Sequence, residues 1–293
     1  RVAHEMTELM GYDTTSDQAG GRIDEVLHPF TVGYYDDIRI TMHYQEADPI
    51  NGVLTILHEA GHALYEQNLK REWKWQPIGV ASSFGVHESI SRFYENVVGR
   101  SVEFWDYCLP RLNDSANNAF GGADKTEFAR ALNQVRPSKI RVTADEVTYS
   151  LHIIIRFEIE RDLFAGKIQV SELPEIWNQK YEEYLGLSID SFAEGVMQDS
   201  HWSNGNFGYF PSYALGNIYG GMWLESMSSD LFEWRSDVQK GNLSRIQNWL
   251  VTKLMHKSNL YDPANLIRKV TGKELTAQPF LSYLDDKYTR LFQ

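Results

Sequence analysis

The residues of this chain best suited to chemistry form the string His58-Glu59-Ala60-Gly61-His62. On an α-helix, residues four positions apart lie on one face, so the imidazoles of His58 and His62 can both reach one metal ion. Glu59 lies one step round the helix, where its carboxylate can contact a water on the metal without binding the metal. This pattern is typical of zinc hydrolases. We therefore predict a metal site in which Glu59 takes a proton from water.

The surrounding residues predict a buried helix over about 51–69, because most of them are apolar. Pro49 and Asn51 supply a stop signal and an N-cap candidate before it. Burying two histidines and a glutamate is costly unless something compensates them, and a metal ion does so. The alternative interpretation is two hydrogen-bonded core histidines beside a surface glutamate. The apolar positions are Val53, Leu54, Ile56, Leu57, Ala60, Ala63 and Leu64.

A catalytic zinc ion needs a third protein ligand and one open position for water. The candidate is Glu88, which follows His62 by 26 residues and lies near the start of a second predicted helix over about 86–98. That separation suits a loop and an antiparallel return. His87 and Glu95 are rivals for the role, and Glu95 could equally pair with Arg92 as an ordinary helix ion pair. Spacing favours Glu88 but leaves these alternatives open.

Composition bounds the class of protein. The chain has 293 residues with 42% hydrophobic and 23% charged content, which is ordinary globular composition. Its net charge of −12, without a basic run, argues against nucleic acid or an anionic membrane as a partner. The single cysteine, Cys108, fits a cytoplasmic setting and is expected to be a buried small hydrophobe. No membrane-spanning run or signal-peptide pattern is visible, and the start at Arg1 rather than Met suggests a fragment or processed form.

The chain is predicted to be one mainly α-helical domain, residues 1–293, with a little sheet. We expect a helix end over 1–10, a loop over 11–34, and a strand where Ile38, Ile40 and Met42 alternate with polar residues. Thr143 and Glu146 indicate a capping box, and Gly166 a helix C-cap. The further helices are expected at about 101–120, 125–135, 144–165, 171–185, 188–197, 214–237, 241–254, 262–271 and 277–290.

Two segments, 139–147 and 195–213, have compositions unusual for plain scaffold. The second gathers histidine, tryptophan, glutamine and further aromatic residues in a glycine-rich loop before a helix. Loops of this kind often line functional sites. The alternative is a structural loop whose aromatic side chains fill space.

Five motifs occur in chain order: DxRxT at 37–41, HExxH at 58–62, HES at 87–89, IRxxAD at 140–145 and GxxQDxHW at 195–202. Taken together, they resemble the motifs of the carboxypeptidase Taq family of metallocarboxypeptidases, and the likeness runs from about Gly11 to the C-terminus. One departure is Ile90, where many members carry glutamine.

The resemblance implies a metal-dependent exopeptidase that releases single C-terminal residues from peptides with broad preference. It also implies an elongated helical fold with a small sheet beside a metal-containing groove, usually as a homodimer. It supports Glu88 as the third ligand of one divalent ion per chain. A set of two histidines and one glutamate favours zinc and also accepts cobalt.

The resemblance further identifies Arg141 as the binder of the substrate's terminal carboxylate, which its planar guanidinium fits bidentately. The alternative role for Arg141 is to pair with Asp145, four residues on. His201, Gln198 and Tyr209 are implied as site residues, and Tyr213 could take the part of Tyr209. In this scheme His201 or Tyr209 shares the oxyanion charge that develops as the peptide carbonyl is attacked.

Family members usually carry a long N-terminal helical portion before the matched region. We therefore expect this chain to be the C-terminal portion of a longer family fold. The apolar faces of the helices at 86–98 and 144–165 would then need a cover, either a second copy of the chain or a separate polypeptide, and we expect a homodimer. The rival functions are an endopeptidase or aminopeptidase with the same metal site, and a non-catalytic remnant that binds peptides.

Overall fold

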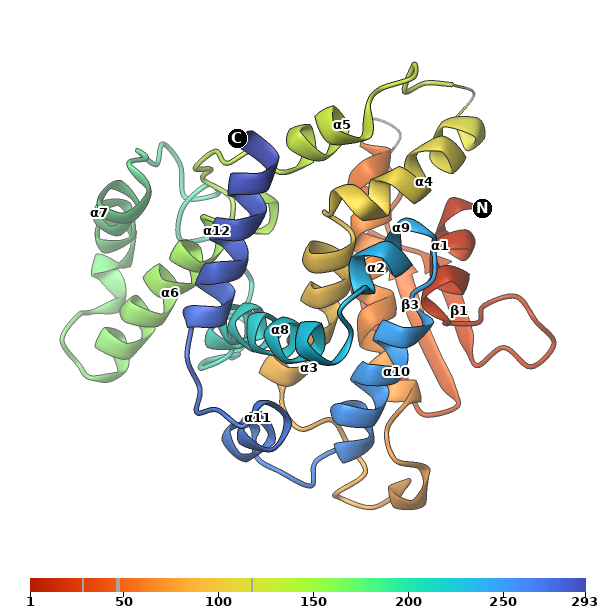
Figure 1. Cartoon of the computed structure of the whole chain (residues 1–293). Coiled ribbons are helices and arrows are strands. Elements are labelled where there is room, and N and C mark those ends of the chain that lie inside the picture. The colour runs from red at the N-terminus through yellow and green to blue at the C-terminus, as the bar shows by residue number, and fades with distance from the viewer. Residues whose placement is uncertain (28, 46–47, 117) are drawn as a thin grey trace. The chain divides into compact units, whose positions relative to one another are not determined.

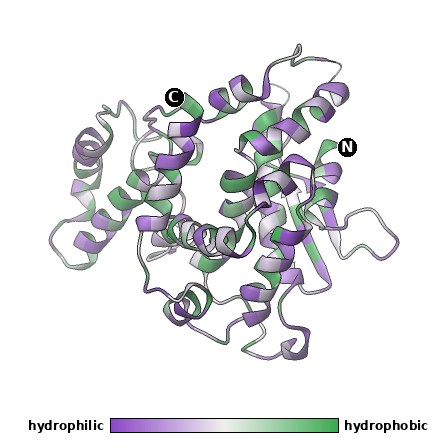
Figure 2. Ribbon diagram, viewed as in Figure 1, coloured by the Kyte–Doolittle hydropathy of each residue, from purple (hydrophilic) through white to green (hydrophobic). Residues whose placement is uncertain are grey.

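The computed structural model describes residues 1–27, 29–45, 48–116 and 118–293. The chain folds into two units, one formed by 1–132 with 216–293 and the other by 133–215, and each is described by itself. Helices dominate the described residues, together with one small three-stranded sheet (Figure 1). Most helices carry both hydrophobic and hydrophilic residues (Figure 2). The mainly α-helical class with a little sheet is confirmed.

The sheet consists of β1 (Gly21–Glu25), β2 (Phe30–Tyr34) and β3 (Asp37–Met42). β3 lies in the middle, parallel to β1 and antiparallel to β2. The predicted strand is confirmed, with Ile38, Ile40 and Met42 fully buried. The predicted loop over 11–34 was wrong, because it contains β1 and β2. Both strands are short, lack a clear alternation of polar and apolar residues, and form by pairing with β3.

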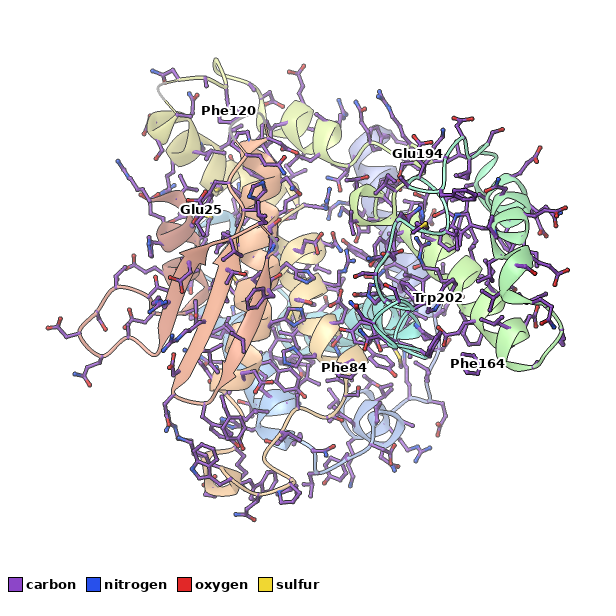
Figure 3. All side chains as sticks on the ribbon, turned by 180° about the vertical axis from the view of Figure 1, so that it is seen from behind. Glu25, Phe84, Phe120, Phe164, Glu194 and Trp202 are labelled. Carbon is purple, nitrogen blue, oxygen red and sulfur yellow. The ribbon has the colours of Figure 1, made fainter. Side chains whose placement is uncertain are left out.

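The helix that carries the HExxH string is α2 (Pro49–Gln67), which packs against β2, β3 and α1 (Val2–Met10). Figure 3 shows the three strands side by side, with helices behind them. The carboxylate of Asp48 accepts the backbone N–H of Asn51 at 3.1 Å and caps the helix. Asn51 was therefore the wrong N-cap. The cap is Asp48, and Pro49 is the first helical residue, where its missing N–H costs nothing.

The second helix of the predicted site is α3 (Phe84–Arg92), and the exposed Phe84 marks its start in Figure 3. It continues directly as a π-helical segment, η2 (Phe93–Val98). The predicted helical region over 86–98 is thus confirmed, although its last turns are wider than an α-helix. π-Helical segments of this kind occur frequently at functional sites.

The rest of the first unit is helical. The predicted helix over 214–237 divides into two, because the chain turns at Leu231. Cys108 is buried and free, as expected. The remaining elements are α4 (Val102–Ser115), α5 (Lys125–Leu132), α8 (Pro211–Asp230, in which the division between units falls), α9 (Trp234–Gln239), α10 (Ser244–Lys253), α11 (Pro263–Thr271), α12 (Gln278–Phe292), η1 (Arg71–Trp73) and η5 (Met255–Lys257).

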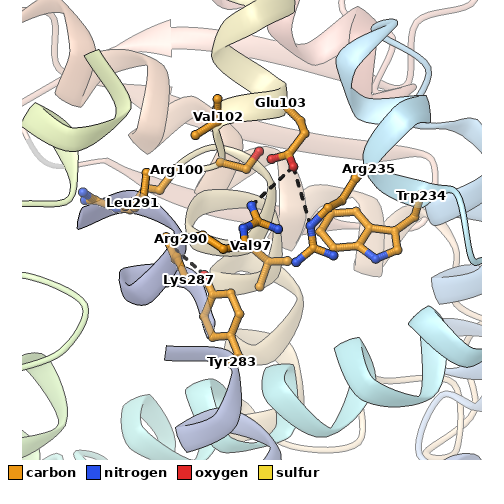
Figure 4. Close-up of a pocket in the computed structure, with 11 residues that line it drawn as sticks. Val97, Arg100, Val102, Glu103, Trp234, Arg235, Tyr283, Lys287, Arg290 and Leu291 are labelled. Carbon is orange, nitrogen blue, oxygen red and sulfur yellow. Dashed lines mark hydrogen bonds and ion pairs between the residues drawn. The ribbon is translucent and has the colours of Figure 1, made fainter. Parts of the chain in front are cut away.

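One ion-pair cluster joins three of these helices. The Oε1 atom of Glu103 on α4 lies 3.6 Å from Nε of Arg235 on α9 and 3.4 Å from Nη2 of Arg290 on α12 (Figure 4). The small cavity beside these side chains has a volume of about 20 Å³, which is room for about one water molecule. The cluster therefore connects α4, α9 and α12 and contributes to the stability of the fold.

The second unit contains α6 (Tyr149–Phe164), α7 (Leu173–Leu185) and the short turns η3 (Arg141–Thr143) and η4 (Val170–Glu172). α6 and α7 pack together through a core of large side chains. Trp177 and Tyr181 stack there with ring centroids 5.2 Å apart. The buried members of this core are Ile155, Ile159, Trp177, Tyr181 and Leu185.

Three expectations for this unit were wrong. The helix predicted over 144–165 begins only at Tyr149, since the Asp145 carboxylate accepts the backbone N–H groups of Val147 and Thr148 and holds a turn there. The capping box of Thr143 with Glu146 does not form. Residues 188–197 form turns rather than a helix. By contrast, Gly166 adopts a φ of 68° just after the end of α6, the left-handed conformation expected of a glycine at that place.

Candidate metal centre

Three side chains of the first unit form a group that could hold a metal ion. His58 and His62 come from α2 and Glu88 from α3, and their ligand atoms all lie within 4.8 Å of one another. Oε2 of Glu88 lies 3.8 Å from Nε2 of His58 and 3.4 Å from Nε2 of His62. Two ligands on a tetrahedral zinc ion would lie about 3.3 Å apart. The donor set and its spacing therefore fit such an ion.

Glu88 is held in place by its surroundings. Nε of Arg92 donates to Glu88 Oε1 at 2.9 Å, one helical turn further along α3. Gly216 on α8 leaves room for the side chain, because a Cβ atom there would lie 2.7 Å from Glu88 Cγ. Burial alone would raise the pKa of Glu88, but the neighbouring His58, His62 and Arg92 outweigh it and lower that pKa. The carboxylate is thus ionised and ready to bind a cation.

The two rivals for the third ligand position lie behind the histidines. Oε2 of Glu95 is 2.8 Å from Nδ1 of His58, and Nδ1 of His87 is 2.6 Å from Nδ1 of His62. Glu95 also lies 3.4 Å from Arg92, so the ordinary ion pair weighed from the sequence exists as well. His87 and Glu95 therefore contact the side of each imidazole that faces away from Glu88.

These contacts affect the two histidines differently. Burial opposes protonation of His58, but the charges of Glu88 and Glu95 outweigh it and raise its pKa to about 9. Burial lowers the pKa of His62 to about 3, helped by the neighbouring imidazoles. His62 is thus neutral at physiological pH, which is the form that binds metals.

Glu59 lies on the same helix, buried next to the sheet. Thr31 on β2 donates its hydroxyl to Glu59 Oε2 at 2.6 Å and also contacts the backbone carbonyl of Glu59 at 3.0 Å. Burial is the largest influence on the Glu59 carboxyl and raises its pKa. A carboxylate with a raised pKa is a better proton acceptor, as a general base requires. Sequence reasoning missed Thr31, because only the pairing of β2 with β3 brings it to α2.

The second unit gathers the other predicted site residues around Arg141. Its Nε and Nη2 atoms donate to Oδ1 of Asp199 at 3.0 and 2.7 Å, and Nη1 donates to the Tyr149 hydroxyl at 3.1 Å. The expected alternative partner, Asp145, instead binds backbone N–H groups of its own turn. The partner of Arg141 is therefore Asp199, which the GxxQDxHW motif contains but the sequence reading did not single out.

Gln198 connects this arginine to a second one. Its Oε1 atom accepts from the backbone N–H of Arg141 and from Nη2 of Arg156, both at 2.9 Å. Arg156 is fully buried on α6 and also contacts Asp199. Nothing in the local sequence marks Arg156, because an arginine within a helix usually points to solvent. Gln198 thus links Arg141 and Arg156 through hydrogen bonds.

His201 belongs to an aromatic group in the same unit. Its Nε2 atom is 3.0 Å from the Tyr213 hydroxyl, and its ring lies 5.4 Å from that of Tyr209. The guanidinium of Arg141 lies 4.8 Å from the centre of the Tyr213 ring. Burial and the charge of Arg141 lower the pKa of His201. The structure thus brings Arg141, His201, Tyr209 and Tyr213 into one cluster.

None of the helices in the described ranges is both long and apolar enough to cross a membrane.

Comparison with known proteins identifies the family of this chain. The sequence model of the "Carboxypeptidase Taq (M32) metallopeptidase" family matches residues 1–288. Carboxypeptidase 1 of Bacillus subtilis is 41% identical over 97% of this chain, and Thermostable carboxypeptidase 1 of Thermus thermophilus is 41% identical over all of it.

In both cases the match covers 56% of the relative, so the chain spans a little over half the length of these curated proteins. Among solved structures, an M32 carboxypeptidase from Deinococcus radiodurans superposes with a TM-score of 0.94 and 38% identity, over 99% of this chain and 58% of that one. The fold, the motifs and the His-His-Glu group agree with this likeness. The chain belongs to the carboxypeptidase Taq family of metallopeptidases.

Proposed function

We propose that this protein is a metal-dependent carboxypeptidase that releases single C-terminal amino acids from peptides with broad specificity. The observation that carries the proposal is the arrangement on α2 and α3. Glu59 is buried beside a His58–His62–Glu88 group whose spacing fits one ion. Family membership supports peptides as the substrate class. We further propose zinc as the ion, with cobalt as an acceptable substitute.

A bound ion would activate a water molecule and polarise the scissile carbonyl. The protein's own contribution begins with Glu59, which accepts a proton from water and returns one to the leaving amine. The hydroxyl of Thr31 holds the Glu59 carboxylate in one orientation through the 2.6 Å hydrogen bond. His201 or Tyr209 donates to the oxygen on which negative charge develops.

The proposed determinant of exopeptidase character is Arg141. Asp199 occupies the guanidinium edge formed by Nε and Nη2. A substrate carboxylate would therefore bind along the edge formed by Nη1 and Nη2, where Nη1 also donates to the Tyr149 hydroxyl. Asp199 thereby orients the group without blocking that second edge. Gln198 and Tyr213 complete the substrate-binding set in this proposal. Gln198 acts through the backbone of Arg141, and Tyr213 through its hydroxyl and ring.

The decisive test is Glu59→Gln, which is nearly isosteric and removes only the proton acceptor. We expect zinc content and melting temperature to stay at parental values while turnover of a blocked dipeptide falls by about 10²–10⁴-fold. Glu127→Gln, an exposed acid on α5, is the matched control and should change neither. A Glu59→Gln protein that loses its zinc would show that Glu59 is structural, and parental turnover would remove it from the mechanism.

Exopeptidase character is tested with paired peptides that end in a free acid or an amide. The parent should strongly prefer the acid, because a carboxylate forms charge-assisted hydrogen bonds with the guanidinium and a neutral amide does not. Arg141→Ala should abolish most of that preference, whereas the exposed Arg136→Ala should keep it. A parent that cleaves both peptides alike would instead indicate the endopeptidase function. A protein that binds but never cleaves would indicate the non-catalytic one.

A further inference from the structure

A chain of three polar side chains extends from His62 away from Glu88. Nδ1 of His62 lies 2.6 Å from Nδ1 of His87, and Nε2 of His87 lies 2.9 Å from Oε1 of Glu66. His62 and Glu66 are four residues apart on α2, while His87 reaches between them from α3. All three side chains are largely buried, at 18–19% exposure. The proposed mechanism uses neither His87 nor Glu66.

The positions of the hydrogens in this chain follow from what each atom must do. To bind a metal, Nε2 of His62 needs its lone pair, so the ring hydrogen must lie on Nδ1. That hydrogen faces Nδ1 of His87, which must then be an acceptor without a hydrogen. The hydrogen of His87 therefore lies on its Nε2 atom and points at Glu66. An ionised carboxylate accepts hydrogen bonds and donates none.

The reverse arrangement would defeat metal binding. If His87 carried its hydrogen on Nδ1, it would donate to His62, whose own hydrogen would move to Nε2 and block the lone pair. The Glu66 carboxylate disfavours that state, because the Nε2 atom of His87 would then offer it a lone pair rather than a hydrogen. His58 has a simpler support, since Glu95 accepts from its Nδ1 atom directly at 2.8 Å.

We propose that Glu66 is a positioning residue that acts through His87. It keeps the hydrogen of His62 on Nδ1, so that the lone pair of Nε2 faces the metal. This inference rests on the proposed metal site. Partners of metal-binding histidines usually orient the ring and raise its affinity, and their loss costs roughly 10–100-fold in metal affinity. Glu66 would contribute on that scale although it contacts no ligand of the metal.

The first experiment measures hydrogen positions directly. Proteins labelled with ¹⁵N in their histidines and loaded with zinc give ring nitrogen shifts that separate the two tautomers. In the parent we expect His62 to carry hydrogen on Nδ1 and His87 on Nε2. A parent in which His87 carries its hydrogen on Nδ1 overturns the proposal, whatever any variant does.

The second experiment measures zinc affinity by competition with a chelator of known affinity. Glu66→Ala should weaken binding about 10–100-fold, while Glu66→Gln should keep most of it, because its amide oxygen still accepts from His87. Glu72→Ala removes an exposed acid nearby in η1 and should bind zinc like the parent. Equal losses in Glu66→Gln and Glu66→Ala would indicate a simple charge effect, and parental affinity in Glu66→Ala would leave Glu66 without a role. Both overturn the proposal.

Both experiments are independent of peptidase activity. A parent that binds zinc with the expected tautomers but cleaves no peptide contradicts the proposed function and supports this inference. A parent that cleaves peptides while Glu66→Ala keeps full zinc affinity supports the proposed function and contradicts this inference. A parent that binds no zinc overturns both.

Discussion

At the scale of single residues, Asp199 balances two buried positive charges. It contacts Arg141 at 2.7 Å and Arg156 at 2.6 Å, and both arginines are almost entirely shielded from solvent. A buried charge without its partner is strongly destabilising. Asp199 therefore stabilises Arg141, the predicted carboxylate binder, in its buried position.

We predict that Asp199→Asn lowers the free energy of unfolding by about 3–5 kcal/mol at pH 7, the usual cost of removing one partner of a buried pair. Chemical denaturation measures it. The control is Asp190→Asn, whose carboxylate pairs with Lys139 at the surface and should matter by less than about 1 kcal/mol. A similar small loss at Asp199 would show that the two arginines are satisfied without it.

The same variant carries a prediction about pH. Burial raises the pKa of Asp199, but Arg156 and Arg141 outweigh it and the net shift is downward. Its contribution to stability is therefore present above the unfolded pKa, roughly 4, and is lost as pH falls through the lower folded pKa. The stability difference between parent and Asp199→Asn should shrink below about pH 4. A difference that grows on acidification would contradict the assigned direction.

At the scale of elements, the site depends on how closely α2 and α3 approach. Gly61, inside the HExxH string, faces the backbone of α3, and a Cβ atom there would lie 2.8 Å from Ser91 Cα. The glycine thus allows His62 and Glu88 to face each other across the helix pair. Gly52 lies on the same helix with nothing within 4 Å of its added Cβ atom, so the two glycines form a matched pair.

We predict that Gly61→Ala destabilises the protein by about 1–3 kcal/mol, because α3 must move, and that zinc affinity falls with it. Gly52→Ala should stabilise by roughly 0.5–1 kcal/mol through its better helix propensity. Thermal unfolding and chelator competition measure both. Parental stability and affinity in Gly61→Ala would mean that the two helices can separate without harm.

At the scale of the whole molecule, the expected homodimer stays a prediction. One reason for it has weakened, since the apolar face of 86–98 is already covered within the chain: Val86, Ile90 and Phe93 are fully buried. The other reason remains on α6, where Ile154 and Phe157 are 39% and 46% exposed. Exposed apolar side chains mark an interaction site when they belong to a contiguous patch, and these two are the candidates for its centre.

We predict a dimer that dissociates on dilution in sedimentation velocity and that Phe157→Glu shifts toward monomer, because a buried carboxylate opposes association. Phe232→Glu alters an apolar residue that is 86% exposed in the other unit and should leave the equilibrium unchanged. A monomer at every concentration would contradict the homodimer. Equal effects of the two variants would move the interface away from α6.

The sequence by itself determined those features of the candidate site that depend only on neighbouring residues. The spacing of His58, Glu59 and His62 places them along one helix wherever that helix lies, because α-helical geometry depends only on neighbouring residues. The apolar periodicity of 51–69 and 86–98 likewise predicted most of α2 and α3. The motifs were sufficient to identify the family, since they combine specific residues at specific separations.

Only the tertiary structure decided the features that depend on distant partners. The grouping of Glu88, rather than His87 or Glu95, with the two histidines required the crossing of α2 with α3, because all three lie close together in sequence and differ in the face they present. β1 and β2 were missed, since their pairing with β3 rather than their own composition makes them strands. Asp199 became the partner of Arg141 in place of Asp145, because the turn at Asp145 uses that carboxylate to satisfy its own backbone.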